Sequence, residues 1–329
     1  MKVLFDHSNP FVLAHGGFQI QIEQTKNAVK ATGLEVEWLR WWDARQKGDI
    51  IHYFGRPPVW YIEFAHCKKM KVVFEQLLSG TGSRSKKMLA IQKLSIRAGS
   101  MAAFVKSGPF AWKSFEIADG CIANTEWEAY LMRYLFNAPK QKTHVLPNGV
   151  EDAFLNSKEL PRGPWLICTA TITERKRVLE LAQAALNAKT PIWIIGKGYN
   201  ENDPYLRHFI ELSRKSSGLI RYEGEIEDRA ELARHYREAR GFVLLSTKET
   251  RSLSAEEAAA CQCPLLLSDL PWAKSVFKDQ AQYCPITSPG KTAQHLRRFY
   301  DNAPSFRRPH KPLSWSEVGK KLKMIYEQL

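Results

Sequence analysis

Short β-rich runs alternate with helical patterns along almost the whole chain, and this alternation restricts the fold more than any other feature of the sequence. In the first half, a helix is expected from the segment 15–17 to about residue 32, and Gly33 closes it. Strands are expected at residues 2–5, 34–39, 49–54, 71–74, 120–124 and 143–146. Because strands that alternate with helices form parallel sheets covered on both faces, we predict an α/β fold with a doubly wound parallel sheet.

The alternation pauses at residues 156–164, whose composition is typical of a linker, and then restarts. Strands are expected at 165–169, 191–195, 219–222, 241–245 and 264–268, and helices at 178–188, 205–215, 230–239, 255–260 and 314–329. We therefore predict two Rossmann-like domains, residues 1–158 and residues 159–313. Such sheets bind ligands beyond the carboxyl ends of their strands, so a ligand is expected in the cleft between the two domains.

Composition excludes several classes of protein. Hydrophobic residues make up 44% of the 329 residues and charged residues 25%, a balance typical of globular proteins. No apolar run reaches the roughly 18 residues of a membrane span, and the N-terminus has no secretory apolar region, so we expect a cytoplasmic protein. The six cysteines lie mostly in apolar runs without C-x2-C spacing. We interpret them as buried thiols of a reducing compartment rather than zinc ligands.

The formal net charge is +14, and one stretch, residues 76–115, contains no Asp or Glu. Its basic residues are Arg84, Lys86, Lys87, Lys93, Arg97, Lys106 and Lys113, interleaved with Met88, Leu89, Ile91, Leu94 and Ile96. One interpretation is a solvated basic helix over a core. The other is a surface for anionic lipid at the inner membrane face, or for a phosphate-bearing acceptor. Nucleic acid is not expected as a partner, because no recognised binding motif accompanies the charge.

The strongest local constellation is residues 246–269, where a buried strand ends in a polar loop and a helix begins near Ser254. The loop holds Glu249, and the helix holds Glu257 eight positions later. The free N–H groups of a helix N-terminus bind anions such as a nucleoside diphosphate, and a carboxylate nearby can accept hydrogen bonds from ribose hydroxyls. The alternative is that Glu256 and Glu257 only offset the helix dipole.

This segment resembles the E-x7-E signature of family 4 glycosyltransferases, which have the GT-B fold and retain the stereochemistry of the sugar. The residues that match in register are Glu249, Leu253, Glu257, Ala258, Ala260, Cys261 and Pro264. Further landmarks of that family resemble residues 119–124, 145–150, 194–198 and 222–226, and Trp315 resembles the tryptophan that opens its C-terminal helix. The resemblance is firm from about residue 118 to the end. It implies that the C-terminal helix, residues 314–329, packs back on the first domain.

The resemblance also implies roles for single residues. Glu257 would bind the ribose, and Glu249 would lie beside the donor sugar and its anomeric region. The remaining residues assigned to donor binding are Gly16, Gly17, Thr171, Gly198, Gly224, Ile226, Arg251, Ser252, Leu253 and Ser254. The two glycines at 16 and 17 would let the first loop approach the diphosphate closely, although a flexible helix entrance would also need glycine.

Two cations are expected to neutralise the leaving diphosphate. Lys176 matches the family's phosphate-binding lysine. The position of the family's arginine is occupied by Thr171, or by Ala170 under a one-residue shift, and Arg175, which is close in sequence, could substitute for it. The alternative is that Arg175 and Lys176 only belong to a solvent-exposed helix start. The loop before the helix that begins near Ser254 also departs from the family pattern, because Arg251 and Ser252 replace Phe-Gly there. Arg251 could add a contact to a phosphate or carboxylate.

We therefore expect a retaining glycosyltransferase that moves a sugar from a nucleotide-diphosphate sugar to a glycan or lipid-linked acceptor, in cell-surface polysaccharide or glycolipid synthesis. No metal and no cofactor are expected, because no paired aspartate motif stands out. One alternative is a GT-B sugar-nucleotide epimerase or phosphorylase. The other is a non-catalytic nucleotide-sugar-binding protein of the same fold. The donor sugar, its base and the acceptor stay open.

Overall fold

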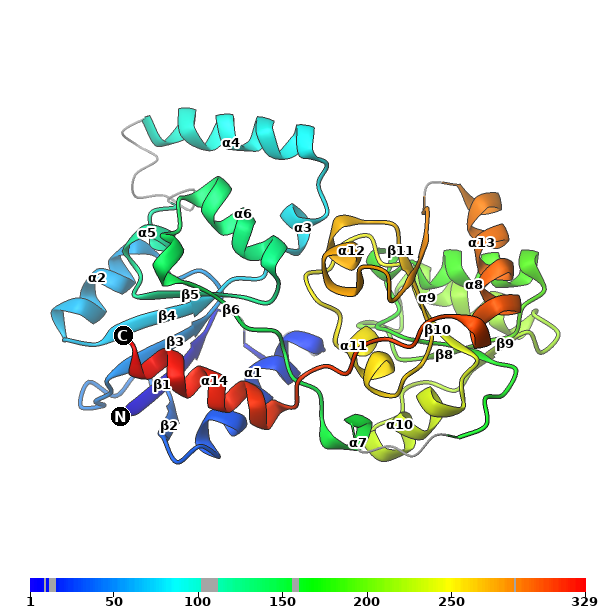
Figure 1. Ribbon diagram of the computed structural model, residues 1–329, viewed down its shortest axis with the longest axis horizontal. Coiled ribbons are helices and arrows are strands. Elements are labelled where there is room, and N and C mark those ends of the chain that lie inside the picture. Colours follow the sequence, from blue (N-terminus) through cyan, green and yellow to red (C-terminus); the bar gives the residue numbers. More distant parts are fainter. Residues whose placement is uncertain (9, 12–15, 102–111, 156–159, 287) are drawn as a thin grey trace. The chain divides into compact units, whose positions relative to one another are not determined.

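A computed structural model describes residues 1–8, 10–11, 16–101, 112–155, 160–286 and 288–329 (Figure 1). Its contacts divide the chain into two units, Met1–Gly149 with Trp315–Leu329, and Val150–Ser314. The second unit begins before the expected residue 159, because Val150 N donates to Leu313 O at 2.9 Å and Phe154 is buried in that unit's core. Residues 156–159 of the expected linker lie outside the described residues, as does His15 of the expected helix entrance.

The first unit contains a six-stranded parallel sheet, as the alternation predicts, with the order β2-β1-β3-β4-β5-β6. Its strands are β1 (Lys2–His7), β2 (Glu35–Trp38), β3 (Ile50–Phe54), β4 (Lys71–Glu75), β5 (Gly120–Ala123) and β6 (Thr143–Val145). All five pairings are parallel, so the carboxyl ends of the strands share one edge.

Two helices far apart in sequence lie side by side in this unit, α1 (Gly17–Lys30) and the C-terminal α14 (Trp315–Glu327) (Figure 1). They approach so closely that a Cβ on Gly319 would lie 2.4 Å from Ala28 O. The other helices are α2 (Val59–Cys67), α3 (Ser79–Gly82), α4 (Lys86–Met101), α5 (Ser114–Ile117) and α6 (Glu126–Phe136), with the 3-10 helix η3 (Lys140–Lys142). Side chains from α2, α5 and α6 form a hydrophobic core with those of the sheet.

The second unit contains another six-stranded parallel sheet, with the order β12-β11-β10-β7-β8-β9. Its strands are β7 (Leu166–Thr169), β8 (Ile192–Ile195), β9 (Ile220–Tyr222), β10 (Gly241–Leu244), β11 (Leu265–Ser268) and β12 (Gln282–Cys284). One hydrophobic cluster includes α8 (Val178–Ala188), α9 (Pro204–Arg214) and α13 (Pro289–Asn302). The opposite cluster includes α7 (Asp152–Leu155), α10 (Arg229–Glu238), α11 (Leu253–Ala260) and α12 (Pro271–Phe277). Short 3-10 helices, η4 (Glu174–Lys176) and η5 (Ala303–Ser305), complete the unit.

No helix among the described residues is long and apolar enough to cross a membrane. Cys67 is exposed at the end of α2, so the expectation of buried thiols is wrong for that residue, whereas the other five cysteines are buried.

Candidate functional site

A buried carboxylate in the loop after β10 binds two basic side chains from the segment after β7. Arg175 Nη1 and Lys176 Nζ lie 2.9 and 2.5 Å from Glu249 Oε1. The backbone joins the same two segments, because Thr247 N donates to Arg175 O at 2.9 Å. Since β7 and β10 are neighbours in the sheet, the loops that follow them meet at its carboxyl edge. The sequence predicted all three side chains as site residues, and the structure brings them together.

The charge state of Glu249 follows from these neighbours. Only 9% of the residue is exposed, and burial by itself would raise the pKa of its carboxyl group. The positive charges of Lys176 and Arg175 outweigh that effect, so the pKa of Glu249 lies below its ordinary value. At neutral pH the cluster therefore carries one carboxylate and two cations, an excess of one positive charge at the edge where open α/β sheets bind ligands.

The second predicted carboxylate, Glu257, lies in α11 and is 7% exposed. Arg229 Nη2 donates to its Oε1, and the Tyr236 hydroxyl donates to its Oε2 at 3.2 Å. Arg229 also donates from Nε to Glu151 Oε1 at 3.0 Å. Burial raises the pKa of Glu257, and the Arg229 guanidinium limits that rise. The carboxyl group is thus held in one orientation by two donors from α10.

Sequence reasoning missed Arg229 and Tyr236. Both lie on α10, which begins shortly after the predicted donor-binding residues Gly224 and Ile226. The capping residue Asp228, whose side chain accepts from Ala230 N at 2.8 Å, is a readable signal that a helix begins there. Nothing in the sequence pattern indicates which of its residues would face Glu257.

The loop before α11 places its residues differently from the expectation. The helix begins at Leu253, one residue before the expected Ser254, and Ser252 Oγ caps it by accepting from Ala255 N at 3.4 Å. Arg251 Nη2 lies 2.8 Å from Glu256 Oε1, and both side chains are almost fully buried. This contact has the distance of an ion pair but not the angles of a hydrogen bond. Arg251 is therefore paired with Glu256 of the helix that follows it, and its contact with a donor stays a prediction.

The predicted glycines lie on two different units. Gly198 and Gly224 follow β8 and β9, and Gly224 O accepts from Gly196 N at 2.8 Å. A Cβ on Gly196 would lie 2.0 Å from Ala170 O, so only glycine allows this close packing of the loops. Gly16 precedes α1 in the first unit with φ 132°. Three predicted donor residues remain. Gly17 is exposed, whereas Thr171 and Ile226 are half-buried.

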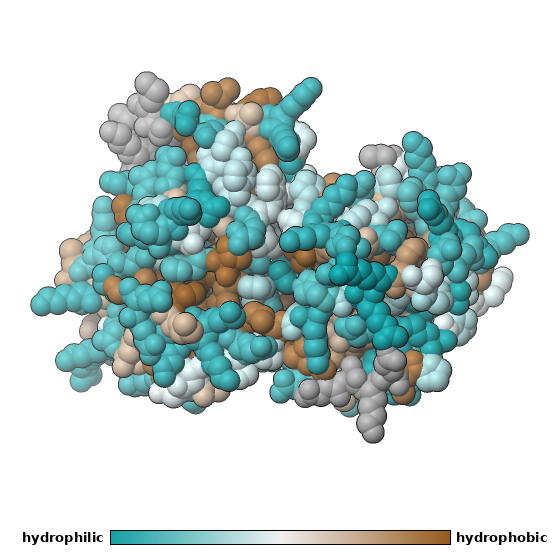
Figure 2. Space-filling model, viewed as in Figure 1, coloured by the Kyte–Doolittle hydropathy of each residue, from teal (hydrophilic) through white to brown (hydrophobic). Residues whose placement is uncertain are grey.

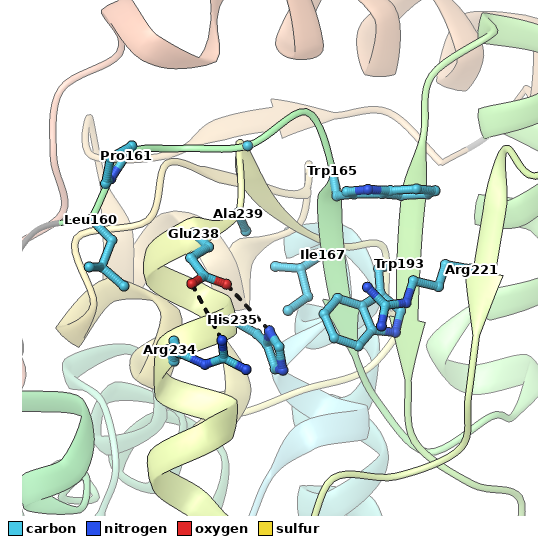
Figure 3. A pocket seen from close by; sticks show the side chains of 11 residues that line it. Leu160, Pro161, Trp165, Ile167, Trp193, Arg221, Arg234, His235, Glu238 and Ala239 are labelled. Carbon is cyan, nitrogen blue, oxygen red and sulfur yellow. Dashed lines mark ion pairs between the residues drawn. The ribbon is translucent and has the colours of Figure 1, made fainter.

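A cavity of about 610 Å³ lies elsewhere in the second unit, between α10 and the strands β7, β8 and β9 (Figure 3). Trp165 and Trp193 form its aromatic walls, and the Arg221 guanidinium lies over the Trp193 ring at 3.7 Å. Among the described residues that line it, none belongs to the predicted donor set. This hollow is therefore separate from the carboxylate and cation clusters.

The comparisons with known proteins decide the family of the second unit. Residues 163–302 match the family model of "Glycosyl transferases group 1". This unit is a group 1 glycosyltransferase domain. The matched range contains Glu249, Glu257 and both cations of the phosphate-binding candidate, whereas the predicted Gly16 and Gly17 lie outside it. No curated protein sequence matches the chain.

Solved glycosyltransferase structures show the same two-unit fold. Sucrose-phosphate synthase from Thermosynechococcus elongatus has a TM-score of 0.66 at 16% identity, covering 100% of this chain and 99% of that one. HepE from Anabaena, in complex with UDP, has a TM-score of 0.66 at 12% identity and full coverage of both chains. WaaG, involved in lipopolysaccharide biosynthesis, has a TM-score of 0.61 at 12% identity, covering 97% and 94%. These structures confirm the predicted GT-B fold. The family match of the second unit shows that the protein is a glycosyltransferase.

Proposed function

We propose that this glycosyltransferase transfers a sugar from a nucleotide-diphosphate sugar to a glycan or lipid-linked acceptor, with retention of stereochemistry. The observation that carries the proposal is the pair of carboxylates at the carboxyl edge of the second sheet, Glu249 with its two cations and Glu257 with Arg229. Similar structures support the donor class, because HepE was solved with UDP and with UDP-glucose, and a pneumococcal O-GlcNAc transferase with UDP and GlcNAc.

The ribose and the diphosphate of the donor each have a matching group in the second unit. Glu257 is held in place to accept hydrogen bonds from ribose hydroxyls. Lys176 and Arg175 would neutralise the diphosphate as the bond between the anomeric carbon and the phosphate oxygen breaks. The acceptor oxygen would then bond to the same face of the anomeric carbon. Its proton would pass to the departing phosphate oxygen, so the reaction needs no protein carboxylate as base.

Nucleotide binding tests this proposal directly. We expect UDP, GDP or ADP, together with one of their sugar conjugates, to raise the melting temperature of the second unit by about 5–10 °C at 100 times Kd, because a ligand of the folded state stabilises it by about 2.7 kcal/mol. The free nucleosides and free glucose serve as controls. If no nucleoside diphosphate or nucleotide sugar shifts the melting temperature, the proposed donor class is wrong.

The variant Glu257→Ala assigns the binding to the proposed site. Two hydrogen bonds between a carboxylate and ribose hydroxyls are worth about 1.5–3 kcal/mol each, so the variant should bind the donor at least about a hundredfold more weakly. Arg229 keeps its contact with Glu151 at 3.0 Å, so the fold should survive. Glu231→Ala, which removes an exposed carboxylate of α10, is the matched control.

We also propose that α4 places the protein on an anionic membrane surface. Met88, Ile91 and Leu94 are exposed on this helix, whereas its residue Leu89 is buried. Lys86, Lys87 and Arg97 are exposed as well, while Lys93 Nζ packs over the Tyr134 ring at 3.7 Å and Arg84 Nη1 donates to Gln92 Oε1 at 2.8 Å. Figure 2 shows apolar side chains among hydrophilic ones where Figure 1 places α4. Lys106 lies outside the described residues.

Charge reversal tests the membrane surface. Each basic residue near an anionic bilayer contributes about 1 kcal/mol, so changing Lys86, Lys87 and Arg97 to Glu should weaken binding to phosphatidylglycerol vesicles at least about a hundredfold. The control reverses Lys47, Lys68 and Lys69, which are exposed in the same unit. Equal sedimentation of both triple variants with the vesicles would show that α4 is only a solvated basic helix.

A further inference from the structure

Among the described residues of the first unit, four aromatic side chains that the nucleotide-binding proposal does not use are more than half exposed. Trp41 and Trp42 follow β2 and are 66% and 82% exposed, while Trp60 and Phe64 on α2 are 52% and 65% exposed. Single exposed hydrophobic residues are ordinary, but a contiguous group marks a binding surface. Both segments follow strands of the parallel sheet, so they begin at the edge where open α/β sheets bind ligands.

Ring contacts through Tyr61 join Trp41, Trp60 and Phe64 into one surface, and Trp42 follows Trp41 directly in the same loop. The ring of Trp41 lies 6.2 Å from that of Tyr61, Tyr61 lies 5.9 Å from Trp60, and Trp60 lies 6.0 Å from Phe64. We name Trp41, Trp42, Trp60 and Phe64 the aromatic platform. Tyr61 is buried beneath it and connects the loop after β2 to α2.

A buried carboxylate fixes the platform from below. Asp6 lies near the end of β1 and is almost fully buried. The Tyr61 hydroxyl donates to its Oδ2 at 2.6 Å, and Trp41 Nε1 donates to its Oδ1 at 3.3 Å. Asp6 therefore holds both Tyr61 and Trp41 in place, and the indole N–H of Trp41 already has a hydrogen-bond partner.

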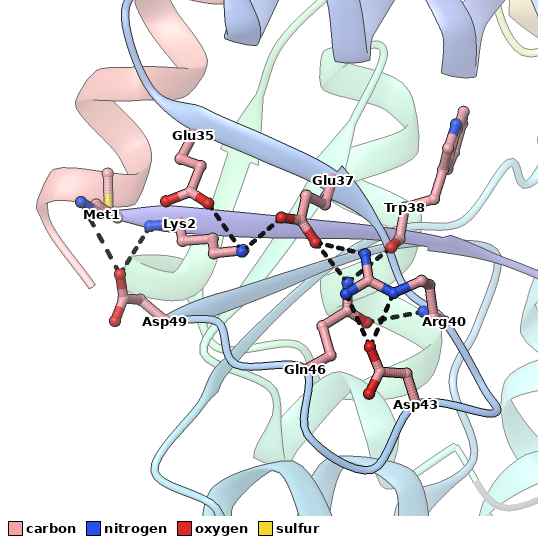
Figure 4. Close-up of polar contacts among 9 residues, drawn as sticks. All are labelled: Met1, Lys2, Glu35, Glu37, Trp38, Arg40, Asp43, Gln46 and Asp49. Atoms are coloured by element: carbon pink, nitrogen blue, oxygen red, sulfur yellow. Dashed lines mark hydrogen bonds and ion pairs between the residues drawn. The ribbon is translucent and has the colours of Figure 1, made fainter.

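A polar network fixes the loop that carries Trp41 and Trp42 (Figure 4). Arg40 binds Glu37 at 2.8 Å and Asp43 at 2.9 Å. Gln46 donates to Glu37 Oε2 and to Trp38 O, each at 2.9 Å, and its Oε1 accepts from Arg40 N at 2.8 Å. The loop thus presents two indoles to solvent on a closed frame, and a rigid aromatic surface loses little conformational entropy on binding.

We propose that the aromatic platform binds neutral sugar rings of the acceptor, an inference that rests on the proposed glycosyl transfer. A pyranose ring has an apolar face that fits a flat indole and hydroxyls that reach polar groups at its edge. The exposed Glu63 lies between Trp60 and Phe64 in α2, and the guanidinium of Arg40 is already paired. A carboxylate between two of the platform rings disfavours an anionic lipid headgroup, so we argue for a neutral glycan as the ligand.

Nitrogen-15 spectra of the indole N–H groups can locate such binding, because each of the ten tryptophans gives its own signal. The probes are maltopentaose, cellopentaose and chitopentaose, each at up to 10 mM. We expect at least one probe to shift the signals of Trp41, Trp42 or Trp60. The double variant W42A/W60A should bind that probe at least about tenfold more weakly than the unaltered protein does. W165A, which removes a partly exposed tryptophan of the second unit, should bind it as the unaltered protein does.

Two outcomes would overturn the platform: no shift of its indoles with any of the three saccharides, or equal affinity in W42A/W60A. Indole shifts with phosphatidylglycerol vesicles and none with saccharides would instead make this surface a membrane contact. Nucleotide-induced melting shifts, measured on the same samples, separate this test from the proposed function. Unaltered nucleotide binding in W42A/W60A shows that the variant is folded, whereas a failure of every nucleotide to bind even the unaltered protein would count against the donor assignment alone.

Discussion

Replacing Lys176 by alanine is expected to lower the release of nucleoside diphosphate from the donor about 10²- to 10³-fold, with a much smaller change in donor affinity. The reason is that a fixed cation beside the diphosphate acts most strongly on the charge that develops as the glycosidic bond breaks. Lys176 Nζ lies 2.5 Å from Glu249 Oε1, in a position set by η4 rather than by a long flexible loop. The measurement is the rate of nucleotide release from the donor that the melting experiment identifies.

Two further variants decide what Lys176 does. Lys176→Arg keeps the charge, so it should recover part of the rate. Lys197→Ala removes another lysine of the same unit, one that pairs with Glu225 at an exposed position, and should leave the rate unchanged. A purely structural Lys176 would show the opposite pattern, with a lower melting temperature in Lys176→Ala and an unaltered rate at temperatures where the variant is folded.

The strands were predictable because most of them are short apolar runs between turn residues, and a parallel sheet buries such strands on both faces. Helix α2 was not, because the order of its residues Trp60, Tyr61, Ile62 and Phe64 shows no helical period. The end of the second unit, with α12, β12 and α13, was also missed. There β12 has only three residues, Gln282–Cys284, and pairs with β11 at the edge of the sheet.

The candidate site was predictable only in part. Glu249 and Glu257 belong to a local motif, so the sequence places them by spacing alone. Their partners come from elsewhere, since Lys176 precedes Glu249 by 73 residues and Arg229 precedes Glu257 by 28. Exposed tryptophans such as Trp42 are harder still, because the same residue type in an unknown fold is first assigned to the core.

Two buried carboxyl groups in the first unit lead to the second large expected effect. Glu75, at the end of β4, accepts hydrogen bonds from Gln21 Nε2 and from Asn124 Nδ2, the latter at 2.7 Å. Burial, and then the charge of Glu128, raise the pKa of Glu75 to about 8. Burial raises the pKa of Glu128 to about 7, although the N–H groups of Leu78 and Asn124 that donate to it oppose that rise.

A carboxyl group whose pKa is raised in the folded state lowers the free energy of unfolding as the pH increases. In the unfolded chain Glu75 loses its proton near its ordinary pKa of 4.5, whereas the folded unit keeps it up to about 8. The folded state therefore binds more protons in this window, and its stability is full below pH 4.5 and falls until about pH 8. His52 acts in the opposite direction, because burial lowers its pKa to about 3, but only below its ordinary value of 6.5.

The variant Glu75→Gln should remove most of the pH dependence between 6.5 and 8. The amide has the shape of the protonated carboxyl group and can still accept from Gln21 and Asn124. Over 1.5 pH units the effect of Glu75 amounts to about 2 kcal/mol, or roughly 4–8 °C in melting temperature. The unaltered protein should thus lose this much stability relative to Glu75→Gln, while the exposed Glu63→Gln should follow the unaltered protein. Parallel melting curves for all three proteins would mean that Glu75 is already ionised in the folded chain.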